Sequence, residues 1–322
     1  MIGIILRAKL SHVKQIAFAI YLTGVLDGDF APHMLVTLQW ILKKAEEQKI
    51  AIGSFNTPNL ESLQAVIWAA EELKLPVIIQ FAQVHESWIP LSVISPIMVE
   101  AAKKASVPVC VHLDQGETLE YVQKALDMGF TGVMYDGSNL PYEENVANTK
   151  KAVEMASMKG VGVEAELGSM GRRESGKGDQ SGELDETKIY TDPLQAKEFV
   201  RETGVDALAC SFGTTHGIYL TEPRLDFSVV RNVRGMTEYL PVVMHGGSGV
   251  SKEDFHNAVR SGVRKINYFT YMDKSGGTAD EEYLKGLQKN EPRFFSAIMV
   301  AAREAMKENV KDAMRTFALM DE

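Results

Sequence analysis

Three short polar segments of this chain each follow an apolar run, and each combines histidine or a carboxylate with glycine. They are residues 112–116 (HLDQG), 213–217 (GTTHG) and 245–249 (HGGSG). Imidazole and carboxylate groups can bind a divalent metal or move a proton, and glycine lets backbone N–H groups come close to an anion. Together the segments indicate a metal-assisted active site for a phosphorylated ligand.

The elements that must position these segments alternate between short apolar strands and helical periods. The apolar runs predict eight strands, at 50–55, 76–82, 107–113, 130–136, 161–166, 205–210, 240–245 and 262–268. The segments between them predict helices at 59–74, 92–106, 116–129, 142–159, 193–204, 226–237 and 251–261. Repeated βα units with apolar strands are typical of a parallel sheet covered by helices. Eight units within about 230 residues favour an α/β (β/α)8 TIM barrel, with a doubly wound sheet as the alternative.

The two ends of the chain are predicted to differ. Residues 34–322 form one domain, opened by an amphipathic helix near Met34 and closed by extra C-terminal helices at 279–318. Residues 1–33 contain basic residues and then the apolar stretch 16–26, which resembles a secretory signal. A clear small-x-small cleavage site is missing from this stretch, so we expect an extension outside the barrel or an upstream start.

The composition excludes several partner classes. The 322 residues carry a formal net charge of -9 without a block of Lys or Arg, which argues against nucleic acid or a membrane surface as the main partner. The two cysteines, Cys110 and Cys210, lie inside apolar runs and are predicted to be buried thiols. This cysteine usage favours a cytoplasmic protein.

Polar residues fall at the carboxyl ends of the predicted strands. In order along the chain they are Asn56, Gln80, Asp114, Asp136, Glu166, His216, His245 and Asn267. Barrel enzymes build their active sites at this end, so these eight residues are expected to form one constellation.

In these motifs the chain resembles the class II ketose-bisphosphate aldolases, which include fructose- and tagatose-bisphosphate aldolases. The resemblance runs from about Met34 to Asp273 and is carried by residues 54–56 (SFN), 76–80 (PVIIQ), 112–114 (HLD), 136–138 (DGS), 164–168 (EAELG), 190–193 (YTDP), 213–217 and 245–249. It implies a catalytic divalent metal, usually Zn2+, with a monovalent cation as a further candidate. It also implies cleavage of a ketose phosphate into dihydroxyacetone phosphate and an aldehyde, by a homo-oligomer (dimer or tetramer).

The same resemblance assigns catalytic and metal-binding roles. His216 and His245 match metal ligands, and Asp114 matches the residue that exchanges a proton with the sugar C4 hydroxyl. Glu174, in the Gly- and Ser-rich stretch 168–182, matches a mobile-loop glutamate that moves the proton at C3. Glu166 and Asp136 match an accessory metal position.

Three of these residues have simpler interpretations. Asp114 could instead cap the helix that begins near Gly116. Glu174 could be a solvated loop charge, and Asp136 could hydrogen-bond the turn at 137–138.

Substrate binding is assigned in the same way. Backbone N–H groups next to glycine, with nearby hydroxyl and amide groups, would bind the phosphate and the sugar oxygens. The matching residues are Asn56, Gly217, Gly246, Gly247, Ser248, Asn267 and Thr270.

The chain departs from the family pattern at the metal site. Gln115 stands where a third metal-binding histidine is expected, and a neutral amide oxygen is a poor zinc ligand. The metal should therefore bind more weakly, or Glu166 or Asp114 should complete the ligand set. His112 precedes Asp114 by two residues and is expected to support the site from a layer below.

Further departures change the phosphate contacts. Leu220 replaces a phosphate-binding lysine and Phe269 replaces an aspartate, whereas Arg172 and Arg173 precede Glu174. We expect the two arginines either to bind an anionic substrate group or to be solvated loop cations.

Two functional hypotheses follow. The first is a metal-dependent lyase, an aldolase with an altered metal site and phosphate pocket. The second is a barrel of the same descent that binds, isomerises or epimerises phosphosugars without aldol cleavage. Fold alone does not separate them.

Overall fold

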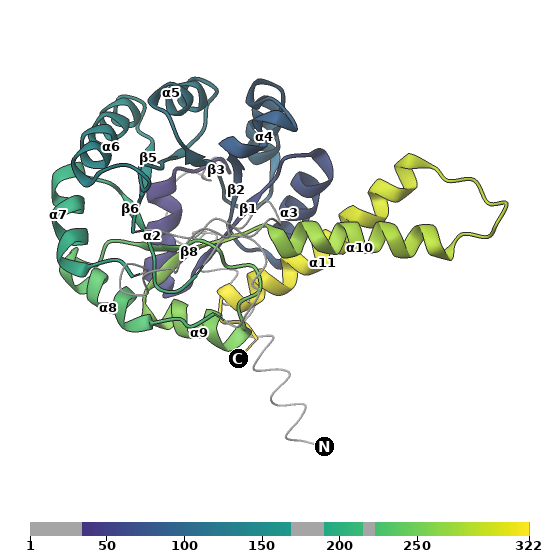
Figure 1. Cartoon of the computed structure of the whole chain (residues 1–322). Helices are drawn as coiled ribbons and strands as arrows, with labels where there is room; N and C mark the ends of the chain where they lie inside the picture. Colours follow the sequence, from purple (N-terminus) through teal and green to yellow (C-terminus); the bar gives the residue numbers. More distant parts are fainter. Residues whose placement is uncertain (1–33, 169–189, 215–222, 322) are drawn as a thin grey trace, which may run out of the picture.

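Eight parallel strands close into a barrel in the order β1 to β8, with each strand paired to its neighbours in sequence and β1 paired to β8 (Figure 1). The computed structural model describes residues 34–168, 190–214 and 223–321. The strands are β1 Ile52–Asn56, β2 Val77–Ala82, β3 Val109–Gly116, β4 Gly132–Tyr135, β5 Gly162–Leu167, β6 Ala207–Cys210, β7 Val242–Met244 and β8 Val263–Tyr268. The predicted TIM barrel is confirmed, and the doubly wound alternative is wrong.

Helices surround the barrel. They are α2 Leu38–Gln48, α3 Leu60–Leu73, α4 Leu91–Lys104, α5 Leu119–Asp127, α6 Tyr142–Ser157, α7 Pro193–Thr203, α8 Phe227–Met236, α9 Lys252–Ser261, α10 Thr270–Gly286 and α11 Phe295–Phe317, with a 3-10 turn η1 Gln83–Ser87 after β2. Every described residue of the eight strands is buried, because helices cover the outside while side chains fill the inside. Cys110 and Cys210 are free and buried, as predicted.

Helix α2 closes the amino-terminal end of the barrel. Its first N–H, from Leu38, donates to the Thr131 carbonyl just before β4, and Gln39 contacts Asp206 just before β6. Its Glu46 binds Arg264 at the start of β8. The helix therefore touches strand starts around the ring, which leaves the carboxyl-terminal end for chemistry.

Helices α10 and α11 pack against each other and project from the barrel as an arm (Figure 1). The carboxyl-terminal half of α11 fastens the arm: Phe317 packs on Phe255 and Tyr268, and its carbonyl accepts a hydrogen bond from the Ala51 N–H. The outer part carries the exposed side chains Phe294, Phe295 and Val300.

The start of the extra helices was predicted too late. Helix α10 begins at Thr270 directly after β8, nine residues before the predicted 279. Gly276 and Gly277 interrupt the helical pattern in the sequence, but Gly276 packs under Met306 of α11, where an added Cβ would lie 3.1 Å from Met306 Cγ. A close helix crossing therefore explains the glycine. The proposed extension 1–33 lies outside the described residues, and within the described part no helix is long and apolar enough to cross a membrane.

Glu46 is expected to stabilise the closed end of the barrel. It accepts hydrogen bonds from Arg234 at 2.8 and 2.9 Å and from Arg264 at 2.8 Å, and both arginines are buried. Because Glu46→Ala leaves two buried guanidinium groups without their carboxylate, we expect unfolding free energy to fall by about 2 kcal/mol. Urea unfolding measures this. Glu47→Ala, which removes an exposed pair with Lys44, serves as the control and should change stability by less than about 0.5 kcal/mol. Equal losses in both variants would contradict the argument.

Candidate active site

One pocket lies at the carboxyl-terminal end of the barrel and collects residues from β1, β2, β3, β7 and β8. It is lined by Asn56, Ala82, Val84, His85, Asp114, Gln115, Gly246, Gly247, Ser248, Asn267, Tyr268, Phe269 and Thr270. Eight of the residues assigned from the sequence to catalysis, metal binding or substrate binding are in this set. The structure therefore brings these eight residues together at one pocket, although their roles are a separate question.

Asp114 is held in the pocket by three side-chain amides. Asn56 and Gln80 donate to Oδ2 at 3.0 and 3.2 Å, and Asn267 donates to Oδ1 at 3.1 Å. Gln80 is itself fixed by the Ser54 hydroxyl, which donates at 2.6 Å. The helix-cap interpretation of Asp114 is wrong, because Thr118 caps α5. The carboxylate has a fixed orientation at the pocket wall, as a group that moves a proton requires.

Gln115 lies at a bend in the barrel edge. Its φ is +46°, in the left-handed region that non-glycine residues rarely adopt, and the pairing of β3 with β4 shifts register between Leu113 and Gly116. The next residue must be glycine, since an added Cβ on Gly116 would lie 2.6 Å from the Met134 carbonyl oxygen. This bend lets both Asp114 and Gln115 line the pocket.

Below the pocket, the carboxylate of Glu164 is completely buried among three basic groups. Lys265 Nζ lies 2.9 Å from Oε2, His112 Nε2 lies 3.3 Å from Oε2, and His245 Nε2 lies 2.7 Å from Oε1. Burial alone would raise the pKa of Glu164, but Lys265 and the two histidines hold this pKa well below its usual range. The charge of this carboxylate therefore sets the orientation of His245.

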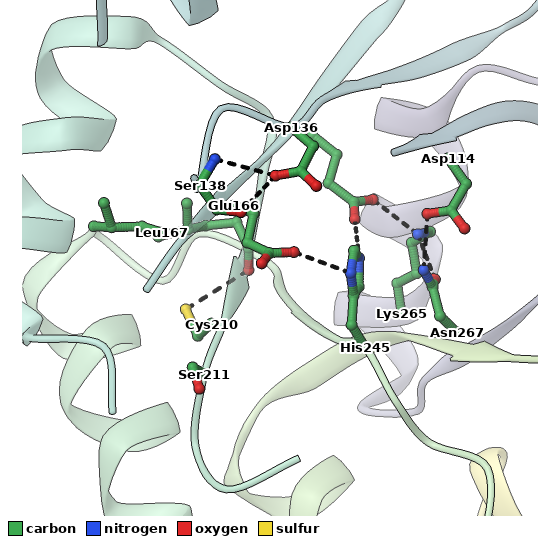
Figure 2. A network of polar contacts seen from close by, with 12 residues as sticks. Asp114, Asp136, Ser138, Glu166, Leu167, Cys210, Ser211, His245, Lys265 and Asn267 are labelled. Carbon is green, nitrogen blue, oxygen red and sulfur yellow. Dashed lines mark hydrogen bonds and ion pairs between the residues drawn. The ribbon is translucent and has the colours of Figure 1, made fainter. Parts of the chain in front are cut away.

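Lys265 joins this buried cluster to Asp114. It donates to Asn267 Oδ1 at 2.6 Å, and the amide nitrogen of Asn267 donates to Asp114. Figure 2 shows Asp114, Asn267, Lys265 and His245 as neighbours in one network of polar contacts. A single chain of contacts thus runs from the candidate metal ligand His245 to the candidate proton carrier Asp114.

His245 Nδ1 and Glu166 Oε2 are nitrogen and oxygen donors of the kinds that bind a divalent cation. Nε2 of His245 contacts Glu164, and its Nδ1 forms an ion pair with Glu166 Oε2 at 3.2 Å, between two buried side chains. A carboxylate that fixes the far nitrogen of a histidine ligand is typical of zinc sites. Burial lowers the pKa of His245, but Glu164 and Glu166 outweigh it and raise this pKa to about 10.

Within the described residues, no group of three or more His, Cys, Asp or Glu could hold a metal by itself. A full ligand set would need groups beyond these, and His216 lies outside the described residues. Asp136 accepts from the Ser138 N–H at 3.1 Å and from its hydroxyl at 2.6 Å, which is the turn contact that its simpler interpretation predicts.

At the ends of β7 and β8 the backbone segments come very close together. The Gly247 N–H donates to the Asn267 carbonyl at 3.2 Å, and an added Cβ on Gly247 would lie 2.9 Å from that oxygen. The Ser248 hydroxyl accepts from Phe269 N–H at 3.3 Å, beside Thr270, the first residue of α10. The amino terminus of a 17-residue helix therefore opens onto the pocket, where its N–H groups favour an anion.

Several assigned residues lie outside the described part of the chain: Arg172, Arg173, Glu174, His216, Gly217 and Leu220. Sequence reasoning missed three residues that the structure places at the site, namely His85, Glu164 and Lys265. Glu164 precedes Glu166 by two residues and Lys265 precedes Asn267 by two. A charged residue inside an apolar strand, two positions before a polar residue at the strand end, points to the same face of the sheet. This spacing was the signal that could have revealed Glu164 and Lys265.

Comparison with known proteins agrees with this geometry. Residues 36–322 match the family model "Fructose-bisphosphate aldolase class-II". A probable fructose-bisphosphate aldolase of Bacillus subtilis is 39% identical over 289 residues, and a fructose-bisphosphate aldolase of Staphylococcus aureus is 38% identical over 287; each match covers 88% of this chain and 97% of the relative. The crystal structure of the YdjI aldolase from Escherichia coli superposes with a TM-score of 0.77 at 36% identity, covering 88% of this chain and 97% of that one.

The fold and the strand-end site thus define a barrel lyase of the aldolase class. The chain belongs to the class II fructose-bisphosphate aldolase family. The resemblance inferred from the motifs is confirmed.

A pH dependence of stability follows from His85. Burial lowers the pKa of His85 to about 4, against the opposing charge of Asp114, so the folded protein keeps this ring neutral where the unfolded chain, at about 6.5, takes up a proton. The contribution of the neutral His85 ring to the free energy of unfolding is fully present above pH 6.5. As pH falls from 6.5 to 4, the free energy of unfolding decreases by about 3 kcal/mol at most. Chemical unfolding between pH 4 and 7.5 measures this. The free energy of unfolding should change less steeply with pH for His85→Asn than for the unsubstituted protein. The same pH dependence in both proteins would show that the ring is accessible to protons in the folded state.

Proposed function

We propose that this aldolase is a metal-dependent class II enzyme that cleaves or forms a ketose phosphate, with dihydroxyacetone phosphate and an aldehyde as the products of cleavage. The observation that carries the proposal is the fixed carboxylate of Asp114, joined through Asn267, Lys265 and Glu164 to His245. An acid-base group and a metal ligand in one rigid network are what a retro-aldol reaction needs.

A divalent cation such as Zn2+, held by His216 and His245 with Gln115 or Glu166, would stabilise the negative charge that develops on the ketone oxygen during cleavage. Asp114 accepts the proton of the C4 hydroxyl as the C3–C4 bond breaks and the aldehyde forms. Glu174 then returns a proton to C3. Glu166 and Asp136 would serve an accessory metal position, and a monovalent cation beside the phosphate is a further expectation from the family resemblance.

The phosphate of the dihydroxyacetone half is proposed to bind where β7, β8 and α10 meet. The amino terminus of α10 supplies N–H groups and the positive end of a helix dipole, and Ser248 and Thr270 supply hydroxyl groups. Gly246 and Gly247 give access to backbone N–H groups, and the family resemblance assigns the same role to Gly217. Asn56 and Asn267 contact the sugar oxygens, and Arg172 and Arg173 are proposed to bind an anionic group.

We place the working protein in the cytoplasm.

The function is tested by measuring dihydroxyacetone phosphate released from a panel of ketose 1-phosphates and bisphosphates, together with the metal content of the purified protein. We expect bound divalent metal, release that stops with a chelator, and recovery when Zn2+ is restored. Asp114→Asn should lower kcat by about 10²–10⁴-fold, since it keeps the amide contacts but accepts no proton.

Comparison of the wild type with the variant Gln115→His separates the two functional hypotheses. The histidine variant should bind zinc more tightly, which a competition titration with a chelating dye measures directly. Binding of phosphosugars with no release of dihydroxyacetone phosphate, from either the wild type or Gln115→His, would instead support the non-cleaving barrel.

We also propose that the protein is a homo-oligomer, and the arm formed by α10 and α11 supports this. Phe294 and Phe295, which are 61% and 75% exposed, place two adjacent large apolar side chains on the surface near its far end. A second copy of the chain would cover this apolar surface.

Disruption of the arm should change the oligomeric state. We expect the double variant Phe294→Asp, Phe295→Asp to dissociate to monomers in light-scattering chromatography, because charges would be buried at the interface. Leu194→Asp on α7 is the control, since Leu194 is as exposed as Phe294, at 61%, but lies away from the arm. An unchanged mass of the double variant would move the interface elsewhere.

A further inference from the structure

His85 is a buried, functionally unassigned histidine at the wall of the active-site pocket. It lies in η1, directly after β2, and its side chain is almost completely buried. Its Nδ1 has no hydrogen-bond partner among the described residues, although the residue lines the same pocket as Asp114. A buried ring nitrogen without a partner costs stability, so its presence beside a ligand pocket points to a ligand contact.

The ring is held in place by aromatic packing. The Trp88 ring packs on it with 4.6 Å between ring centroids, and the Phe269 ring, which also lines the pocket, has its centroid 5.1 Å away. The backbone is fixed as well, because the His85 carbonyl accepts hydrogen bonds from the Trp88 and Ile89 N–H groups. The imidazole is therefore a preorganised group, with one donor and one acceptor nitrogen when it is neutral.

The charge around His85 limits what can bind there. Among the described residues that line the pocket, only Asp114 carries a formal charge, and it is negative. The phosphate-binding groups lie at the β7, β8 and α10 side, whereas Ala82, Val84 and His85 form the β2 side. A second phosphate at the β2 side would meet an apolar wall, a neutral ring and a carboxylate.

We propose that His85 hydrogen-bonds a hydroxyl group of the aldehyde half of the substrate, and that the pocket selects an unphosphorylated hydroxyaldehyde over a phosphorylated one. This inference depends on the aldolase function proposed above. It deepens that function, because it names the chemical class of the half that the reaction releases. Hydroxyl groups match a neutral imidazole, which can both donate and accept, and the C–H faces of a sugar chain match the neighbouring apolar groups.

The test runs the reaction in the direction of condensation, with metal-loaded protein and dihydroxyacetone phosphate as the fixed partner. The aldehydes are glyceraldehyde, erythrose and glyceraldehyde 3-phosphate. The wild type should show a higher kcat/KM with glyceraldehyde or erythrose than with glyceraldehyde 3-phosphate. A preference for glyceraldehyde 3-phosphate of tenfold or more would overturn the proposal.

Variants at position 85 then locate the contact. His85→Leu should lower kcat/KM for the unphosphorylated aldehydes by about tenfold, the effect of one lost hydrogen bond, and His85→Asn should recover part of this loss. Trp88→Phe keeps an aromatic ring over position 85 and is the control for packing, with an expected change of less than about twofold.

A second measurement separates contact with the aldehyde from general damage to the site. The proton on the hydroxymethyl carbon of dihydroxyacetone phosphate, which becomes C3 of the ketose, exchanges with deuterated water without any aldehyde. His85→Leu should therefore leave the rate of this exchange unchanged within about twofold. An equal loss of exchange and condensation would make His85 a structural residue and overturn the inference. If the wild type shows neither exchange nor condensation, the proposed aldolase function itself has failed.

Discussion

The site depends on one buried carboxylate. Glu164 has no exposed surface, and an isolated charge at such a position would cost several kcal/mol. The structure meets this cost with three partners from three other strands: His112 from β3, His245 at the end of β7 and Lys265 from β8. Since β3 and β7 are not neighbours in the ring, these groups can meet only inside a closed barrel. Barrel closure and assembly of the site are therefore the same physical event.

Lys265 makes the two chemical halves of the site interdependent. Its ammonium group binds Glu164, which orients His245, and also Asn267, which holds one oxygen of Asp114. The other oxygen is held by Asn56 and Gln80, so Asp114 has little freedom to turn. Preorganised polar groups of this kind spare the reaction the cost of reorienting dipoles. The opposite end of the barrel, closed by α2 and the pair of buried arginines, carries stability instead of chemistry.

Much of this arrangement could be predicted because parallel strands place their carboxyl ends at one edge. That rule predicts that Asp114, His245 and Asn267 lie together at one end of the barrel, whereas their individual roles come from the family resemblance. The partners inside the barrel were not assigned, since strands buried on both faces show no alternation that tells the inner side from the outer. Which charges meet across the barrel depends on strand stagger, and no single strand encodes it.

Two other misses have local causes. The start of α10 was placed too late because Gly276 marks a close helix crossing, whereas the sequence alone shows only an interrupted pattern. His85 was missed because it follows its strand by three residues, in a 3-10 turn that carries it back over the pocket. The roles of Glu174 and His216 rest on family resemblance and that of Arg172 and Arg173 on side-chain chemistry, since these residues lie outside the described part of the chain.

The environment of His245 favours positive charge at its imidazole ring. Glu164 and Glu166 approach the two nitrogens of this ring at 2.7 and 3.2 Å, and they favour a proton on it strongly enough to raise its pKa to about 10. The same negative field favours any cation at Nδ1, so a metal ion and this proton compete for one position. A third imidazole would add a neutral donor, but Glu166 adds a full negative charge at the place where the proton is lost. We therefore expect the affinity of the proposed metal site to depend on these two carboxylates more than on Gln115.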